Sequence, residues 1–274
     1  MFKIIIMALL IFIGMVGYDN ITDKAQPTTP VQQEQQKVSK HEKSAAMALF
    51  TSLLPTKEEW PSPVHKFYLA FNMDEVIDPI RQNPNWTGLD AMSRDIPQAL
   101  IAIEDHAFYN HGAIAVEGIL RATLANINAG EVVQGGSTLT QQFVKNVFLS
   151  HEQSMERKIE EAVLSLMLED NYSKDEILEL YLNTTYFGAG STGIKQASRT
   201  YFGKAPSALT LAEAAVIASL PYAPTSLNPL ENPEGCKKRQ LLVLAAMHKY
   251  GMINKGQLEE AKAEKIRLTN GTVM

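Results

Sequence analysis

The chain opens with an uncharged, largely apolar run over residues 4–18, which Lys3 precedes. A span of the bilayer core takes about 20 apolar residues, whereas the apolar part of a cleaved signal peptide takes about 7–15. The run lies between these lengths, and the residues near its end suit cleavage poorly. We therefore expect an uncleaved transmembrane signal anchor over residues 1–18, with a cleaved signal peptide as the alternative. Because Lys3 stays on the cytoplasmic side, the rest of the chain is expected on the outer face of the membrane.

A polar segment separates this run from the rest of the chain. Residues 19–44 are rich in Gln, Lys, Thr and Pro and contain no aromatic residue. Such a segment buries too little apolar surface to offset the entropy lost on ordering. Residues 45–62 are transitional, and the pattern then becomes that of a globular domain. We divide the chain into an anchor over 1–18, a flexible stalk over 19–62 and one domain over 63–270.

Within this domain, apolar residues recur mostly at helical spacing, and the alternating pattern of strands is scarce. Ser173 with Glu176, and Thr210 with Glu213, have the spacing of capping boxes at helix N-termini. The pattern predicts a mainly α-helical domain. Besides the two helices that follow these boxes, we predict helices over 96–107, 137–149, 155–169, 241–250 and 255–265.

Charge and cysteine content exclude several classes of function. The chain has 274 residues and a formal net charge of −5, so it has no overall attraction to nucleic acid. An anionic ligand must therefore be held by a local cluster of cations. Cys236 is the only cysteine, which excludes an intramolecular disulfide and a cysteine-based zinc site. His106 and His111 are five residues apart, a poor spacing for metal ligands on a helix, and we predict no metal site built from them.

The first candidate for chemistry is an acidic pair, Glu104 and Asp105, which directly follows an apolar stretch. Desolvation at the edge of an apolar wall disfavours the charged form of a carboxyl group, which is how proteins prepare a general base. The alternative is an acidic pair at a helix end that faces water, as most acidic residues do.

The second candidate is the segment QGGSTLTQQFVKN over 134–146. Its glycines allow a tight turn, and Ser137 or Thr138 can cap the helix that follows. The free amides of a helix N-terminus bind anions. An ordinary capped helix with a polar face remains the alternative. The side chains that share this face supply donors and a cation: Gln141, Gln142 and Lys145.

The third candidate, ERKIEE, places Glu161 four residues after Arg157 and three after Lys158. An intrahelical ion pair is the simplest interpretation of this spacing. One acid in an apolar setting, an anion site and several cations together suit displacement of a phosphate leaving group. A glycosidase instead needs two cooperating carboxyl groups to expel a poor leaving group, so the pattern favours a transferase over a hydrolase. The cations in question are Arg121, Lys145, Arg157 and Lys158.

Four motifs, in order, resemble one known family. They are ED-x-x-F-Y-x-H at 104–111, QGGSTLTQQ-x-VKN at 134–146, RK-x-x-E at 157–161 and YSKDEILE-x-YLN at 172–183. They are similar to the glycosyltransferase domain of class A penicillin-binding proteins and of monofunctional peptidoglycan glycosyltransferases. The resemblance covers about residues 90–250.

The resemblance implies a mainly α, lysozyme-like, two-lobed domain on the outer face of the bacterial cytoplasmic membrane. It implies inverting polymerisation of lipid II into glycan strands, with release of undecaprenyl pyrophosphate. Glu104 would be the base, Asp105 would support it, and Glu161 would align the cations of the pyrophosphate side. No cofactor is obligatory, although a divalent cation, Mg or Mn, could assist at the pyrophosphate. The expected partners are lipid II, the growing strand, the membrane and other cell-wall synthesis proteins. Substrate contacts are implied for Arg121, Ser137, Gln141, Gln142, Lys145, Asn146, Arg157 and Lys158.

The chain departs from the family pattern in two places. Gln153 stands where the family usually has an arginine, which removes one charge from the expected cation cluster, and the stretch 111–113 reads His-Gly-Ala in place of His-x-Gly. No serine is followed three residues later by lysine and no KTG occurs, so we expect no penicillin-reactive serine. Two other functions stay open, namely a muramidase-type enzyme that cleaves glycan and a non-catalytic lipid II-binding protein.

Overall fold

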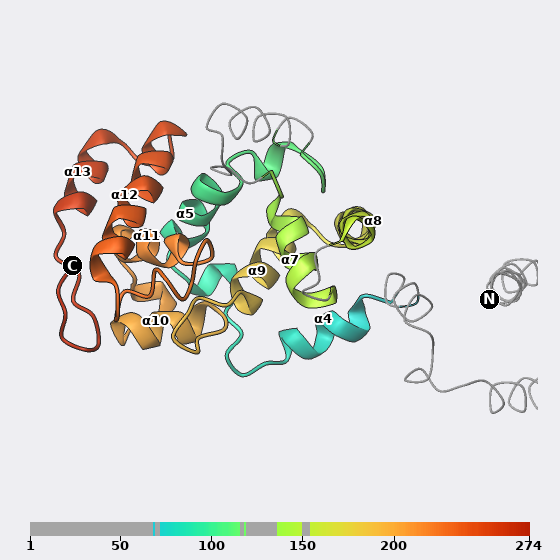
Figure 1. The fold of residues 1–274 in the computed structure, drawn as a ribbon, viewed down its shortest axis with the longest axis horizontal. Coiled ribbons are helices and arrows are strands. Elements are labelled where there is room, and N and C mark those ends of the chain that lie inside the picture. Colours follow the sequence, from blue (N-terminus) through green and yellow to red (C-terminus); the bar gives the residue numbers. More distant parts are fainter. Residues whose placement is uncertain (1–67, 69–71, 116–117, 119–135, 150–153) are drawn as a thin grey trace, which may run out of the picture. The chain divides into compact units, whose positions relative to one another are not determined.

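The computed structural model describes residues 68, 72–115, 118, 136–149 and 154–274. Within these residues the chain is helical, and β pairing is limited to two isolated antiparallel bridges, Tyr186 with Thr192 and Arg267 with Val273. The prediction of a mainly α-helical domain is confirmed (Figure 1). The predicted anchor and stalk lie outside the described residues. In the part of the chain that is described, no helix combines the length and apolar character that a membrane span requires.

The α-helices of the described residues range from 8 residues in the shortest to 17 in the longest. Short 3-10 helices connect several of them, at η2 (Leu89–Ala91), η3 (Phe108–Asn110) and η4 (Pro206–Ala208). The α-helices are α4 (Asp74–Arg81), α5 (Asp95–Glu104), α7 (Leu139–Phe148), α8 (Met155–Asn171), α9 (Lys174–Thr184), α10 (Ile194–Phe202), α11 (Leu211–Ser219), α12 (Pro233–Lys249) and α13 (Lys255–Ala263).

Two groups of packed helices organise the domain. Helix α11 contacts both α5 and α12, which also contact each other, and α7 contacts both α8 and α9. Every residue of α11 after Leu211 is buried, so this helix lies in the centre of its group. Its alanines favour the helix and allow close packing, and the Thr210–Glu213 capping box fixes its start. Figure 1 shows α5 reaching toward α7, so the end of α5 meets the second group.

The capping boxes predicted at Ser173 and Thr210 are both confirmed. Two helix bounds were predicted wrongly. Helix α5 ends at Glu104 rather than at residue 107, because Asp105 leaves helical geometry, with φ −158° and ψ 68°. Helix α12 begins at Pro233 rather than near residue 241, because Asn232 caps it through a bond from the Gly235 amide and proline is favoured in a first turn.

A glycine-containing turn joins α9 to α10. Gly188 has φ +88°, and a Cβ at this position would lie 2.3 Å from the backbone oxygen of Pro224. Only glycine fits such a close approach, because any side chain would collide with backbone atoms. The turn therefore holds the end of α9, which contributes to the site described below, against the segment that follows α11.

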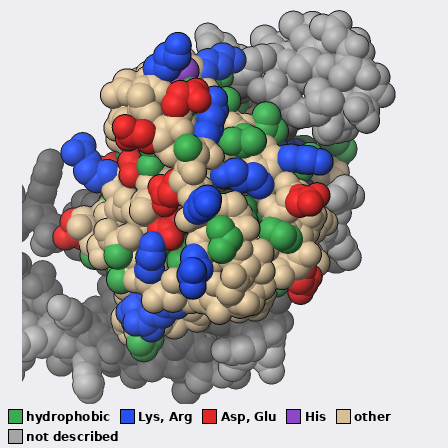
Figure 2. All heavy atoms as spheres, turned by 90° about the vertical axis from the view of Figure 1, so that its left-hand side faces the viewer, with side chains coloured by type: hydrophobic (Ala, Val, Ile, Leu, Met, Phe, Trp, Pro, Cys, Tyr) green, Lys and Arg blue, Asp and Glu red, His purple; other side chains and the backbone are tan. Residues whose placement is uncertain are grey.

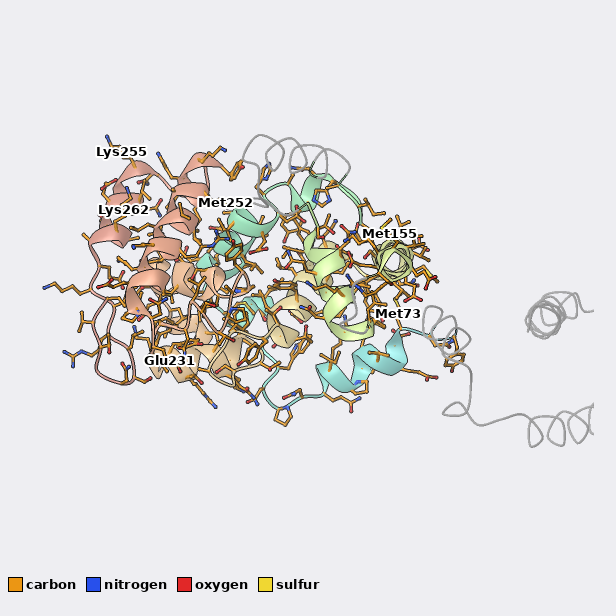
Figure 3. All side chains as sticks on the ribbon, in the orientation of Figure 1. Met73, Met155, Glu231, Met252, Lys255 and Lys262 are labelled. Carbon is orange, nitrogen blue, oxygen red and sulfur yellow. The ribbon has the colours of Figure 1, made fainter. Side chains whose placement is uncertain are left out.

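The surface differs between the two helix groups. Over α12 and α13, Lys and Arg side chains are spread with Asp and Glu between them (Figure 2). Helix α8 instead exposes an apolar stripe of Met155, Ile159, Val163 and Leu166, whose exposed fractions are 78%, 62%, 49% and 55%. Met155 marks the start of this stripe in Figure 3. The spacing of four, four and three residues places all four side chains on one face of the helix.

Candidate active site

Glu104 is the last residue of α5 and faces the first turns of α7. Its Oε2 accepts a hydrogen bond of 3.0 Å from Nε2 of Gln142. Within the described residues, no lysine or arginine lies within ion-pair distance of this carboxyl group. Its direct polar partner is therefore a neutral amide.

Burial raises the pKa of Glu104 above the ordinary value of a glutamic acid. The hydrogen bond from Gln142 opposes this effect, as do the positive charges of Arg239 and Lys145, and the neighbouring Asp105 charge adds to the rise. A carboxyl group with a raised pKa is a better proton acceptor once it is ionised. The carboxyl group therefore has the desolvated setting that the sequence predicts, and its role as a base stays a prediction.

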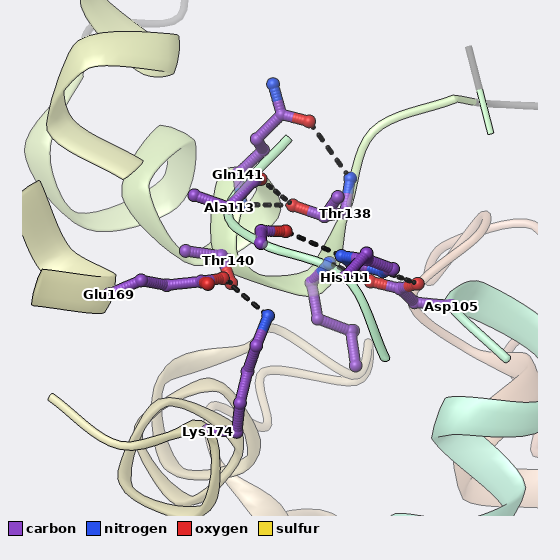
Figure 4. A network of polar contacts seen from close by, with 10 residues as sticks. Asp105, His111, Ala113, Thr138, Thr140, Gln141, Glu169 and Lys174 are labelled. Atoms are coloured by element: carbon purple, nitrogen blue, oxygen red, sulfur yellow. Dashed lines mark hydrogen bonds and ion pairs between the residues drawn. The ribbon is translucent and has the colours of Figure 1, made fainter. Parts of the chain in front are cut away.

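Asp105 fastens the chain after Glu104 to the start of α7 (Figure 4). Its Oδ2 accepts a bond of 3.0 Å from the Leu139 amide, and its Oδ1 lies 2.6 Å from Nε2 of His111. The other ring nitrogen of His111 lies 2.6 Å from the carbonyl oxygen of Gly112. Both ring nitrogens of His111 thus face oxygen atoms, which holds the ring between Asp105 and Gly112. Asp105 thereby supports Glu104 through the backbone rather than by touching its side chain.

Two further contacts hold the residues that follow Glu104. The ring of His106 stacks on Tyr250, just beyond α12, with 4.1 Å between ring centroids. The hydroxyl group of Tyr109 donates a bond of 2.7 Å to Asp175 in the first turn of α9. With the contacts of Asp105, these interactions connect the segment to α7, α9 and the end of α12.

Thr138 caps α7. From the sequence, Ser137 and Thr138 are the two candidates for this cap. The Gln141 amide donates to the Thr138 hydroxyl oxygen, and the Thr138 amide donates to the Gln141 side-chain oxygen, both at 3.1 Å. The Thr138 hydroxyl in turn donates to the carbonyl oxygen of Ala113 at 2.8 Å. Gln141 is therefore buried as part of the cap, and it does not share an outward face with Gln142 and Lys145. The predicted anion site at this helix end receives the protein's own Asp105.

Glu161 lies on α8 and is 1% exposed. Its Oε1 pairs with Nζ of Lys158, and its Oε2 lies 3.4 Å from Nη1 of Arg157. The intrahelical ion pair expected from the spacing is therefore present. Lys158 also donates a bond of 3.1 Å to the Ser137 hydroxyl group, just before α7. Among the residues described, Nε of Arg157 is buried and has no hydrogen-bond acceptor.

The start of α7 connects the two glutamates. Gln142 donates to Glu104, and Lys158 donates both to Ser137 and to Glu161. Lys145 and Asn146 are exposed one turn further along α7, and the Lys145 charge acts on Glu104. Predicted residues that lie outside the described part of the chain are Arg121 and Gln153.

Two residues of the site were missed from the sequence. Tyr181 of α9 donates a bond of 3.0 Å from its hydroxyl group to Oε1 of Gln142, and Arg239 of α12 is one of the cations that act on Glu104. The Arg239 guanidinium also lies over the ring of Tyr222, 4.1 Å from its centroid. Arg239 lies outside the quoted motifs. Tyr181 belongs to the motif over 172–183, but that motif does not indicate a hydrogen bond from its hydroxyl group to Gln142.

The sequence of the chain is similar to those of known transglycosylases and penicillin-binding proteins. The family model described as Transglycosylase matches residues 73–248. A protein of Cupriavidus necator whose name describes it as a transglycosylase is 41% identical over 194 residues, which cover 71% of this chain and 84% of that protein. Penicillin-binding protein 1A of Neisseria flavescens is 44% identical over 185 residues, which cover 68% of this chain and 23% of that protein.

The penicillin-binding proteins are much longer than the matched region. Penicillin-binding protein 1F of Bacillus subtilis is 39% identical over 197 residues, 72% of this chain and 28% of that protein. The crystal structure of penicillin-binding protein 1A from Haemophilus influenzae is 34% identical, with a TM-score of 0.34, and covers 48% of this chain and 16% of that one. The matched region spans about a quarter or less of these proteins. From the family match and the C. necator relative, the chain belongs to the transglycosylase family, whose activity is glycosyl transfer in peptidoglycan synthesis.

Proposed function

We propose that this chain polymerises lipid II into glycan strands by an inverting transfer that releases undecaprenyl pyrophosphate. The observation that carries the proposal is the setting of Glu104. Its carboxyl group has a neutral hydrogen-bond donor at 3.0 Å, a pKa raised by burial, and the positive charges of Lys145 and Arg239 acting on it. This combination suits a carboxyl group that acts as a general base in its ionised form.

The reaction needs one proton acceptor. Glu104 takes the proton of the 4-hydroxyl group of the acceptor sugar while that oxygen forms a bond to the anomeric carbon of the donor. The bond between the anomeric carbon and the phosphate oxygen breaks, and the electron pair leaves with the pyrophosphate. Because a pyrophosphate is a good leaving group, no second carboxylic acid has to protonate it, in contrast to glycoside hydrolysis.

The departing charge requires cations. Arg157 and Lys158 are held by Glu161 on α8, and Lys158 also contacts Ser137 beside the start of α7. The buried Nε of Arg157, which has no acceptor among the described residues, is a donor that a phosphate oxygen can satisfy. Fixed cations stabilise charge that develops in the transition state. We include Arg121, Lys145, Gln142 and Asn146 among the proposed substrate contacts.

The family resemblance implies that a divalent cation could assist at the pyrophosphate. In the described parts of the chain, no three His, Cys, Asp or Glu side chains come together as metal ligands. Glu161 is the glutamate expected on the pyrophosphate side, and its carboxyl group already forms ion pairs with Arg157 and Lys158. These residues do not fit a protein-held metal ion, and no step is assigned to one.

The setting in the cell is part of the same proposal. We propose that residues 1–18 anchor the chain in the bacterial cytoplasmic membrane, that the domain has the two-lobed, lysozyme-like form of its family, and that it acts on the outer face. Lipid II and the growing strand are then reached at the membrane surface. Support comes from the apolar run at the N-terminus and from the family match over residues 73–248.

The decisive experiment is polymerisation of labelled lipid II by the full chain in detergent, followed by gel separation of the products. We expect polymer from the wild type and a loss of roughly 10²–10⁴-fold in rate for Glu104→Gln, because the amide cannot accept the proton. An unchanged rate in Glu104→Gln would remove Glu104 from its role. The fold of the variant is checked by its thermal melting curve.

The same assay separates the two other functions. Soluble fragments released from purified sacculi, with no product from lipid II, would favour a muramidase-type enzyme. Binding of lipid II without polymerisation, together with turnover restored by Gln153→Arg, would favour a non-catalytic binding protein. Either result would overturn the proposal for the natural chain.

A further inference from the structure

A short chain of hydrogen bonds leads from the core of the domain to Glu104. The hydroxyl group of Tyr181, on α9, donates to Oε1 of Gln142 at 3.0 Å, and Nε2 of Gln142, on α7, donates to Oε2 of Glu104 at 3.0 Å. Tyr181 is 1% exposed. The contacts join α9, α7 and α5, which belong to both packing groups of the domain.

The direction of these bonds follows from the chemistry of the three groups. An ionised carboxylate can only accept, so the amide of Gln142 must present its NH₂ group to Glu104. The carbonyl oxygen of the amide then faces Tyr181, whose hydroxyl group is the donor. If the amide turned over, its oxygen would lie opposite the carboxylate oxygen, and the two acceptors would repel each other. The carboxylate and the donated hydroxyl proton of Tyr181 therefore favour the same orientation of the amide, and Tyr181 stabilises it by satisfying the amide oxygen.

The phenol keeps its proton under all working conditions. Burial raises the pKa of Tyr181 well above its ordinary value, and the nearby Glu104 charge raises it further. A phenolate would be an acceptor and would reverse the arrangement. Because the hydroxyl group stays protonated, the orientation of the amide does not change with pH.

Other charges also act on Glu104, so the contribution of Gln142 has to be separated from them. Lys145 on α7 and Arg239 on α12 favour the ionised form, and Asp105 opposes it. Within the described residues these three act through space without a direct bond to the carboxyl group. Gln142 is the direct donor and has a larger effect than either cation.

We propose that Tyr181 is a positioning residue: it orients the Gln142 amide so that its N–H bonds to Glu104 and holds the base ionised and aimed for proton transfer. The inference rests on the proposed function, since it assumes that Glu104 is the base. It assigns to a core tyrosine of α9 a part in the reaction that extends beyond packing.

The test is the pH dependence of lipid II polymerisation by the full chain carrying Tyr181→Phe. Without the hydroxyl group, the amide loses its orientation and Glu104 loses its donor. We expect the acid limb of the kcat/KM profile to move up by about 0.5–1 pH unit, because a lost hydrogen bond to the charged form raises the pKa of the carboxyl group. Below the midpoint, kcat is expected to fall by roughly 3–10-fold while KM is unchanged.

Tyr201→Phe is the matched control. Tyr201 is also fully buried, and its hydroxyl group donates a bond of 2.7 Å to the carbonyl oxygen of Phe187, with no contact to Glu104. This variant loses a buried phenol hydrogen bond of the same kind, so a drop in melting temperature is expected in both. Only Tyr181→Phe is expected to move the acid limb. Gln142→Met, which lacks the amide, should produce the same shift, and adding Tyr181→Phe to it should produce no further shift.

The outcomes distinguish this inference from the function on which it rests. If Tyr181→Phe and Tyr201→Phe give superimposable profiles while Glu104→Gln is inactive, the positioning role is wrong and the proposed function stands. If Glu104→Gln polymerises at the wild-type rate, the proposed function itself fails. If Tyr181→Phe is too unstable to assay, Gln142→Met tests the inference in its place. An unshifted acid limb in Gln142→Met would refute a role for the hydrogen bonds that lead from Tyr181 through Gln142 to Glu104.

Discussion

Glu104 and Glu161 are both linked to the start of α7, Glu104 through Gln142 and Glu161 through Lys158 and Ser137, and their neighbours differ in kind. Glu104 accepts a bond from the neutral Gln142 amide, and its pKa is raised by burial. Glu161 lies between Arg157 and Lys158 on its own helix. A carboxyl group beside a neutral donor keeps the capacity to exchange a proton. One that is paired with two cations serves instead to hold those cations in place.

The contrast between the two glutamates separates two demands of the reaction. Proton transfer needs a group whose pKa is close to the working pH, and stabilisation of a leaving diphosphate needs fixed positive charge. Glu161 is buried and Glu104 is half-buried, so burial does not single out the proposed base. The identity of the direct partner does.

The largest expected effects come from replacing each glutamate by glutamine. Both changes should lower the polymerisation rate by roughly 10²-fold or more, Glu104→Gln through loss of the base and Glu161→Gln through loss of cation alignment. Their stabilities should differ. Glu161→Gln leaves two partly buried cations unpaired and should lower the free energy of unfolding by about 2 kcal/mol, whereas Glu104→Gln should change it by less than about 0.5 kcal/mol. Urea unfolding measures the difference, and equal losses would contradict the contrast.

A smaller effect is expected at the helix that connects the two sides. Thr138→Ala removes both the cap of α7 and the bond to Ala113, and should cost about 1–2 kcal/mol together with part of the activity. Ser173→Ala removes a comparable cap from α9, away from the glutamates, and should cost about 1 kcal/mol with the specific activity retained. Thermal unfolding and initial rates of the two variants test this. A comparable loss of activity in both variants would contradict the expectation that the start of α7 matters more for activity than the start of α9.

The smallest effect is expected on the apolar stripe of α8, which is on the same helix as Glu161 but points outward. Ile159→Ser should change the free energy of unfolding by no more than about 0.5 kcal/mol, since the side chain is 62% exposed. Thermal melting of the purified chain measures it. A large destabilisation would mean that this face is covered by another part of the molecule.

Much of the architecture could be predicted from local pattern. The capping boxes at Ser173 and Thr210, the helical class and the ion pair of Glu161 depend on residues three or four positions apart, and all are present. The start of α12 was predicted wrongly, near residue 241, although Asn232 and Pro233 form a standard N-terminal signal. Local chemistry therefore explains the elements and most of their ends.

The features that could not be predicted depend on contacts between distant segments. Helix α5 stops at Glu104 because Asp105 bonds to the amide of Leu139, 34 residues away. In the same hydrogen bond, the Asp105 carboxylate takes the place at the N-terminus of α7 where the sequence predicts an anionic ligand. Tyr181 lies 39 residues from Gln142. It belongs to the motif over 172–183, but neither that motif nor the core pattern of the helix indicates that its hydroxyl group bonds to Gln142.

The contacts that follow Glu104 have a consequence for how a strand can grow. Asp105, His106 and Tyr109 each fasten that short segment to a different helix or helix end. Under the proposed function, the base is fixed on this braced backbone. The sugar chain would then have to move by one repeat past a stationary carboxylate after each bond is made, and the step of elongation would equal the repeat length of the substrate.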